Sequence, residues 1–203
     1  MKMNKIGTDI NELKEALLNG GVVAFPTETV MGLGVVFNNY DAYTKLNQIK
    51  GRPEDKPYTM MLGDTEDIQK FAYVDKRAKL IIDKFMPGPL TILLKARENV
   101  PSWVTHNTGV IGIRVPAFDV LLDILKNVDI PLLVPSANPS GLPPAKNIDK
   151  VLVYFNNSLD YIYYHNSAGG KPSTIIDLTG PSVKLIREGD ISLDVILNQI
   201  GES

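Results

Sequence analysis

The stretch Gly20–Gly34, GGVVAFPTETVMGLG, sets an apolar run directly before a polar cluster. Val22–Phe25 predicts a short buried strand, because a brief apolar run bounded by Gly and Pro is typical of a strand that is covered on both faces. The next four residues, Pro26–Thr29, place two hydroxyls and a carboxylate at the end of that strand. Ligands of α/β proteins gather where strands end, since the rigid sheet orients the loops there. This stretch therefore predicts a binding site at a sheet end.

The segments on either side of this stretch predict helices that alternate with strands. Thr8 is expected to cap a helix that ends at Asn19, because apolar residues recur between them at helical spacing. We expect further helices over residues 39–49, 75–86 and 118–125 and after Ser192, and strands over residues 90–94, 110–115, 130–134, 161–164, 173–178 and 183–186. The irregular alternation favours an α/β fold with a twisted mixed sheet. No linker-like change in composition divides the chain, so we expect a single domain over residues 1–203.

The composition excludes several classes of function. The chain has 203 residues, of which 44% are hydrophobic, and a net charge of -2. Proteins that bind nucleic-acid backbone usually carry a basic excess, which this chain lacks. It has no cysteine, which excludes disulfides and thiolate catalysis, and its two histidines lie far apart in sequence. The N-terminal segment has no long apolar core, so we expect a cytoplasmic protein without a signal peptide or membrane span.

Further polar residues follow or interrupt the other apolar runs, in the segments Lys50–Pro53, Ser136–Asn138, Lys171–Thr174 and Arg187–Gly189. Each has a structural alternative: cations complement the dipole at a helix end, and hydroxyls and amides cap turns. Arg114 is different, because it lies inside the apolar run VIGIRVP, where a buried charge needs a partner.

Familiar nucleotide-binding and hydrolase motifs do not fit this sequence. Gly32-Leu33-Gly34 is followed by apolar residues rather than by the third glycine of a dinucleotide fingerprint. Gly169-Gly170-Lys171-Pro172 lacks the spacing of a phosphate-binding loop. A nucleophile elbow and a zinc-binding helix motif are also missing from the sequence. The sequence therefore argues against a hydrolase or a P-loop enzyme.

Seven segments in order resemble those of the YrdC/TsaC family of threonylcarbamoyl-AMP synthases: PTETVMGLG, KGRPEDKP, PGPLT, IRVP, SANPSG, KPSTIID and IREG. The resemblance runs from about Gly20 to about Gly189, and the ordered set is far more specific than any one motif. It implies a YrdC-like domain, in which a twisted mixed α/β sheet and its helices surround a large basic cavity. It also implies a reaction: L-threonine takes up bicarbonate or CO2, and the resulting carbamate attacks the α-phosphate of ATP and displaces pyrophosphate.

The resemblance further implies roles for individual residues. It assigns the triphosphate to Lys50, Arg52 and Lys56, of which Lys50 and Arg52 are the catalytic pair. It assigns further ATP contacts to Asn138, Lys146 and Arg187, and threonine contacts to Thr29, Arg114, Ser136 and Ser173. Adenylyl transfer needs charge stabilisation and alignment rather than a protein nucleophile, and these residue types can supply both.

The resemblance also sets expectations for cofactors and partners. We expect Mg2+ to enter on the phosphates of ATP and the protein to have no metal site of its own. The product is expected to pass to a tRNA-modifying transferase complex, with at most a weak contact to tRNA. Pro89, Thr91 and Ser140 are expected to brace the cavity, and Asp177 could either orient a basic residue or end a strand.

Two positions depart from the family pattern. Met31 stands where the family commonly has tyrosine, and Met61 stands where it often has histidine. Methionine can fill the same space but cannot donate the hydrogen bond of either side chain. Longer family members carry an extra C-terminal domain, and from the 203 residues we expect the short, single-domain form.

Three alternatives to the synthase stay open at this stage. The first is a module that binds double-stranded RNA or assembling ribosomes without turnover, although a basic stripe with interleaved aromatics is missing. The second is a related enzyme of hydrogenase maturation that makes carbamoyl-adenylate, although those proteins carry cysteine zinc fingers. The third is an amino-acid or nucleotide sensor, which predicts binding without turnover.

Overall fold

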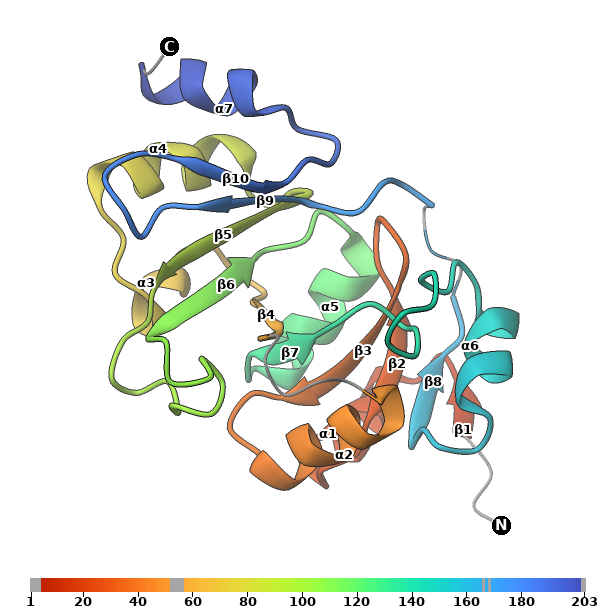
Figure 1. Ribbon diagram of the computed structural model, residues 1–203. Helices are drawn as coiled ribbons and strands as arrows, with labels where there is room; N and C mark the ends of the chain where they lie inside the picture. Colours follow the sequence, from red (N-terminus) through yellow and green to blue (C-terminus); the bar gives the residue numbers. More distant parts are fainter. Residues whose placement is uncertain (1–4, 52–56, 166, 168, 202–203) are drawn as a thin grey trace.

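The apolar run after Gly21 forms strand β2 (Val23–Pro26), and all four of its residues are buried. The chain turns back through residues 27–30 into β3 (Met31–Val36), which pairs antiparallel with β2. The computed structural model describes residues 5–51, 57–165, 167 and 169–201. This hairpin lies within its ten-stranded sheet, so the stretch that predicts a strand and a site forms part of the framework (Figure 1).

The strands of the described residues run in the order β1-β8-β2-β3-β7-β4-β6-β5-β9-β10. Besides the hairpin they are β1 (Lys5–Gly7), β4 (Thr59–Met61), β5 (Leu90–Lys95), β6 (Val110–Arg114), β7 (Leu132–Val134), β8 (Tyr161–Tyr163), β9 (Thr174–Asp177) and β10 (Lys184–Arg187). The pairs β1–β8, β2–β8, β4–β6 and β5–β9 are parallel, and the other ladders are antiparallel. The prediction of a twisted mixed sheet is confirmed.

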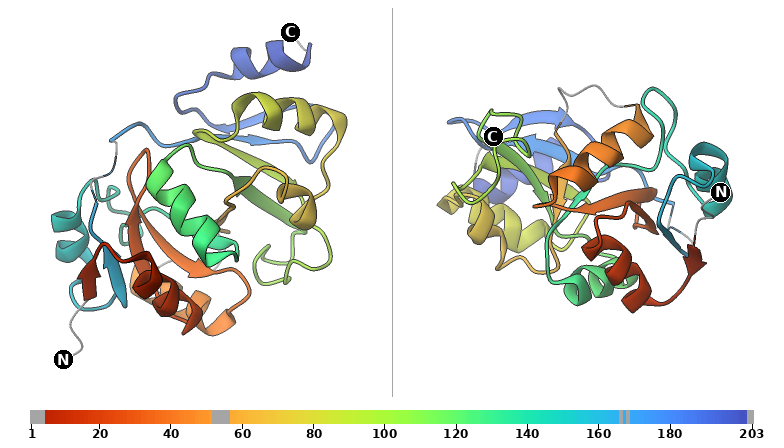
Figure 2. Two further views of the ribbon diagram at one scale, coloured as in Figure 1. Left: turned by 180° about the vertical axis from the view of Figure 1, so that it is seen from behind. Right: turned by 90° about the horizontal axis from the view of Figure 1, so that it is seen from below.

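Helices cover both faces of this sheet. They are α1 (Ile10–Leu18), α2 (Tyr40–Lys50), α3 (Ile68–Phe71), α4 (Lys76–Phe85), α5 (Asp119–Val128), α6 (Ile148–Phe155) and α7 (Leu193–Ile200). Because side chains alternate along a strand, Val23 and Phe25 of β2 pack in one core cluster with α1 and α5. Val22 and Ala24 belong to the larger cluster on the other side, which includes Leu46 of α2. Figure 2 shows α1 and α5 on the face opposite α2.

Helix caps correct one prediction from the sequence. The helix predicted to start after Thr8 is capped by Asp9, whose carboxylate accepts a hydrogen bond of 2.8 Å from the backbone N–H of Asn11. Asp75 caps α4 in the same way, at 2.7 Å from the N–H of Ala78. A carboxylate suits this position, because the first N–H groups of a helix have no partner within the helix and the helix dipole favours negative charge there.

The other predicted helices and strands are present, with boundaries shifted by up to about three residues. The sequence prediction missed β1, β3, β4, α3 and α6. None of the helices in the described part of the chain is both long and apolar enough to span a bilayer.

The glycines of β3 allow the hairpin to close over an aromatic ring. A Cβ on Gly34 would lie 2.5 Å from Cε1 of Phe25, and one on Gly32 would lie 3.3 Å from Cε2 of the same ring. Gly32 and Gly34 point to the same face of the strand, so the Phe25 ring lies across both. The Gly-Leu-Gly sequence that fails as a nucleotide fingerprint therefore serves packing.

We predict that Gly34→Ala lowers the free energy of unfolding by about 1–3 kcal/mol, because the added methyl overlaps the buried Phe25 ring. Urea denaturation followed by circular dichroism measures the change. Gly180→Ala is the matched control, since a Cβ there would meet no atom within 4 Å. Equal midpoints for the two variants would contradict this account of β3.

Candidate functional site

A cavity of about 240 Å³ opens where several strands end. Its wall includes the loop between β2 and β3, the last residues of β6 and β10, the end of β7 with the segment after it, β4, and the beginnings of β5 and β9. Five of the predicted site residues line it: Thr29, Arg114, Ser136, Ser173 and Arg187. The two methionines that depart from the family pattern, Met31 and Met61, line it as well, so their substitution changes the cavity wall itself.

Arg114 lies at the end of β6, and its side chain is only 4% exposed. Its Nη2 lies 2.5 Å from Oε1 of Glu28, and its Nε donates a hydrogen bond of 3.2 Å to the carbonyl of Gly88. The same Glu28 oxygen accepts a hydrogen bond of 3.0 Å from the N–H of Ala117. Glu28 is therefore the partner that the buried charge requires. The sequence offered a signal for it, since Glu28 is the one carboxylate in the stretch PTETVMGLG.

Arg187, at the end of β10, is held against Ser173. Its Nε and Nη2 donate to the carbonyl of Ser173 at 3.0 Å and 2.8 Å, and Nη2 also lies 3.1 Å from the Ser173 hydroxyl. Burial and the nearby charge of Arg114 lower the pKa of Arg187 below its ordinary value. A guanidinium stays protonated at neutral pH, so two positive charges repel each other at this cavity. An anion bound between them would relieve that repulsion.

Thr174 fastens the segment that carries Arg187 to the start of β9. Its side chain is fully buried, and its hydroxyl donates to the carbonyl of Ile191 at 2.6 Å. The hydroxyl also accepts from the N–H groups of Gly189 and Ile191, at 2.9 Å and 3.2 Å. The motifs KPSTIID and IREG are thus locked together. Sequence reasoning missed this role, because a threonine after a serine gives no signal of a contact fifteen residues away.

Lys50 and Asn138 both support the turn at Ser136. The Lys50 ammonium is buried and donates hydrogen bonds of 2.6 Å to the carbonyls of Ser136 and Asn138. The Asn138 side chain accepts from the Ser136 hydroxyl at 2.6 Å and donates to the carbonyl of Leu142 at 2.8 Å. Neither Lys50 nor Asn138 is in the described lining of the cavity, and both contact Ser136, which is.

In the loop between β2 and β3, Thr27 and Thr29 have different contacts. The Thr27 hydroxyl donates to the carbonyl of Val30 at 2.7 Å and accepts from the N–H of Thr29 at 3.0 Å, so it closes the turn. The Thr29 hydroxyl lies 2.9 Å from it, and both residues line the cavity. Asp177, which was ambiguous, binds the N–H and hydroxyl of Thr179 at 2.8 Å and 2.6 Å and so ends β9.

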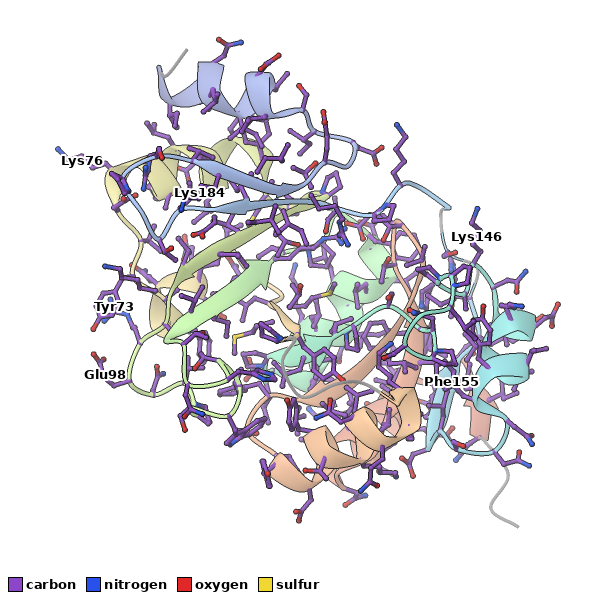
Figure 3. All side chains as sticks on the ribbon, in the orientation of Figure 1. Tyr73, Lys76, Glu98, Lys146, Phe155 and Lys184 are labelled. Atoms are coloured by element: carbon purple, nitrogen blue, oxygen red, sulfur yellow. The ribbon has the colours of Figure 1, made fainter. Side chains whose placement is uncertain are left out.

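The remaining predicted ATP contacts are not part of this cavity as described. Arg52 and Lys56 lie outside the described residues. Lys146 is exposed and lines a separate hollow beside α6, which shares Pro144 with the cavity. Figure 3 shows Lys146 at the periphery of the molecule. The predicted large basic cavity therefore stays a prediction. The described residues contain no group of three histidine or acidic side chains that could hold a metal ion.

Comparisons with known proteins agree on one family. The family model Sua5/YciO/YrdC, described as "Telomere recombination", matches residues 15–189. A threonylcarbamoyl-AMP synthase of Pseudoalteromonas atlantica is 37% identical over 176 residues, which cover 84% of this chain and 92% of that protein. A threonylcarbamoyl-AMP synthase of Pyrococcus abyssi is 34% identical over 185 residues, which cover 90% of this chain and 54% of that protein. This chain thus spans about half the length of the Pyrococcus relative.

A solved structure matches the fold over the whole chain. The crystal structure of Pyrococcus abyssi Sua5 complexed with L-threonine superposes with a TM-score of 0.91 at 31% sequence identity. The match covers 100% of this chain and 62% of that one.

We predict that Thr174→Val destabilises the protein by about 1–3 kcal/mol, because it leaves half-buried backbone groups of residues 189 and 191 without the hydroxyl of the buried Thr174. Thr174→Ser is the control, since it keeps the hydroxyl. Urea denaturation of both variants measures the difference, and a valine variant as stable as the serine variant would contradict the assigned role.

Proposed function

Because the chain belongs to the Sua5/YciO/YrdC family, we propose that it is a threonylcarbamoyl-AMP synthase. It would join L-threonine, bicarbonate and ATP into threonylcarbamoyl-AMP, with release of pyrophosphate and water. The observation that carries the proposal is the buried guanidinium of Arg114 at the wall of a small cavity. All of this chain matches part of a relative whose structure contains L-threonine.

The cavity suits an amino acid in size and chemistry. Pockets for drug-sized ligands span roughly 300–1,000 Å³, and this cavity of about 240 Å³ is smaller. Arg114 would bind the threonine carboxylate, since a guanidinium presents parallel N–H donors that match two oxygens. Thr29, Ser136 and Ser173 would supply hydroxyls for the polar groups of the substrate.

The nucleotide would lie beyond the threonine, along the segment that begins at Lys50. Lys50, Arg52 and Lys56 would stabilise the triphosphate, with Lys50 and Arg52 as the catalytic pair. Asn138, Lys146 and Arg187 would complete the ATP contacts. Mg2+ would enter as part of the substrate MgATP and be held chiefly by the phosphates.

The reaction would be a nucleotidyl transfer in which the protein supplies alignment and charge. The threonine amine adds to CO2 and loses a proton to give the carbamate. A carbamate oxygen then attacks the α-phosphate, and the bond to pyrophosphate breaks. Positive side chains stabilise the charge that moves onto the leaving group. The enzyme would be a single-domain cytoplasmic protein and pass its product to a tRNA-modifying transferase complex.

Purified protein with MgATP is predicted to release pyrophosphate only when L-threonine and bicarbonate are both present. A coupled pyrophosphate assay that omits each substrate in turn measures this dependence. ATP binding without turnover under every combination would move the assignment to a sensor. Salt-sensitive tRNA binding without turnover would move it to an RNA-binding module.

Arg114→Lys is predicted to raise the Michaelis constant for threonine by about 10–100-fold and that for ATP much less, because lysine cannot form the paired contact with a carboxylate. Steady-state kinetics with each substrate varied in turn measures both constants. Arg97→Lys is a matched control, since Arg97 stacks over Tyr73 with its Cζ 4.6 Å from the ring centroid, outside the cavity lining. Equal effects on both substrates would argue against the assignment.

A further inference from the structure

Glu28 lies behind Arg114 rather than in the cavity. Arg114 is among the lining residues, whereas Glu28 is not among those that the structure describes there. The Glu28 side chain is 14% exposed, and its Oε1 is shared between Arg114 Nη2 and the backbone N–H of Ala117. The carboxylate is thus held from two sides and cannot approach a ligand in the cavity without leaving both partners.

The contact between Glu28 and Arg114 is an ion pair rather than a well-aligned hydrogen bond. Nη2 of Arg114 and Oε2 of Glu28 are both buried, and neither has a hydrogen-bond partner among the described residues. The 2.5 Å approach of Nη2 to Oε1 is therefore a contact between one nitrogen and one oxygen. It is not the bidentate pair, with two parallel N–H···O bonds, that arginine can form with a carboxylate. Glu28 and Gly88 thus fix the guanidinium through Nη2 and Nε, which leaves Nη1 as the nitrogen that contacts neither of them.

A second guanidinium makes this support necessary. Both Arg114 and Arg187 line the cavity, and the charge of Arg114 is near enough to help lower the pKa of Arg187, after the effect of burial. Arg187 is bound to the carbonyl and hydroxyl of Ser173, which are neutral acceptors. The negative charge of Glu28 beside Arg114 offsets this repulsion and helps to hold the guanidinium in place.

We propose that Glu28 is a positioning residue that determines threonine affinity through Arg114, without touching the substrate. The proposal rests on the proposed function and deepens it. Glu28 holds the guanidinium at the site where the amino-acid carboxylate would bind. The conformational entropy of the Arg114 side chain is therefore lost when the protein folds and not when the substrate binds. A substrate carboxylate then meets a donor that is already in place.

The geometry separates this role from one in stability. Glu28 lies in the loop after β2 and Arg114 at the end of β6, and β3, β7 and β4 lie between those two strands in the sheet. The hairpin that carries Glu28 is held by its own four-residue ladder, which does not involve the carboxylate. Loss of the charge should therefore act on Arg114 and leave the hairpin folded.

Glu28→Gln tests the proposal, because glutamine keeps the length and the acceptor for the N–H of Ala117 and removes the charge. We expect the Michaelis constant for threonine to rise by about 10-fold or more, which corresponds to about 1.4 kcal/mol. The rate at saturating threonine and the Michaelis constant for ATP should stay within about two-fold of wild type. Glu12→Gln is the matched control, since Glu12 forms an exposed ion pair of 2.8 Å with Lys5 and should change neither constant.

A double variant shows whether Glu28 acts through Arg114. If it does, Glu28→Gln combined with Arg114→Lys should raise the threonine constant no further than Arg114→Lys alone, within about two-fold. A product of the two single effects would overturn the proposal. So would a Glu28→Gln enzyme with the threonine constant of wild type. Pyrophosphate release by the wild-type protein that did not require threonine would instead overturn the proposed function.

Glu28→Asp decides the question if the glutamine variant does not fold, as judged by circular dichroism. Aspartate keeps the charge but withdraws it by one methylene, so the guanidinium should shift toward the loop. A raised threonine constant with an unchanged ATP constant supports the positioning role. An aspartate variant with wild-type constants for both substrates would overturn it.

Discussion

A guanidinium buried at the end of a strand must be compensated by charge and by hydrogen-bond acceptors, because a desolvated charge is costly in a protein interior. Arg114 meets this constraint from two directions. The carbonyl of Gly88 approaches from the segment before β5, and the carboxylate of Glu28 approaches from the loop after β2. Three segments far apart in sequence are therefore tied at one point, and that point is a corner of the cavity. The wall of the cavity depends on this contact, whereas the order of the strands is held by their own backbone ladders.

The fold could be predicted where local patterns and tertiary packing agree. The helix with Leu13 and Leu17 on one face and the strand before Pro26 both have apolar spacing that matches their burial. β3 was missed because its two glycines weaken a strand on local grounds, and their reason is a ring on the neighbouring strand. β1 and β4 have three residues each, which is too short for a periodic signal. Asp9 rather than Thr8 caps α1, a choice between neighbours that the sequence leaves nearly balanced.

The candidate site could be predicted in part for a similar reason. Thr29, Arg114, Ser136, Ser173 and Arg187 each lie at the boundary of an apolar run, and those boundaries converge in the sheet. Glu28 and Thr174 were passed over because their importance lies in partners from other segments: the Arg114 guanidinium in one case and the backbone at Gly189 and Ile191 in the other. A buried cation in a strand indicates that a partner must exist. Its place in PTETVMGLG makes Glu28 a candidate, but the pairing itself depends on how distant strands are ordered in the sheet.

The arrangement of charge around the cavity bears on the first step of the proposed reaction. Carbamate formation requires the neutral amine of threonine, whereas a free amino acid carries an ammonium at neutral pH. The described lining has two guanidiniums and several hydroxyls but no carboxylate, and the carboxylate of Glu28 is already bound to Arg114. Like charges nearby disfavour a protonated amine and lower its pKa. A wall that attracts the carboxylate end of the substrate would thus favour loss of a proton from its amino end, so the feature that binds threonine would also prepare it to react.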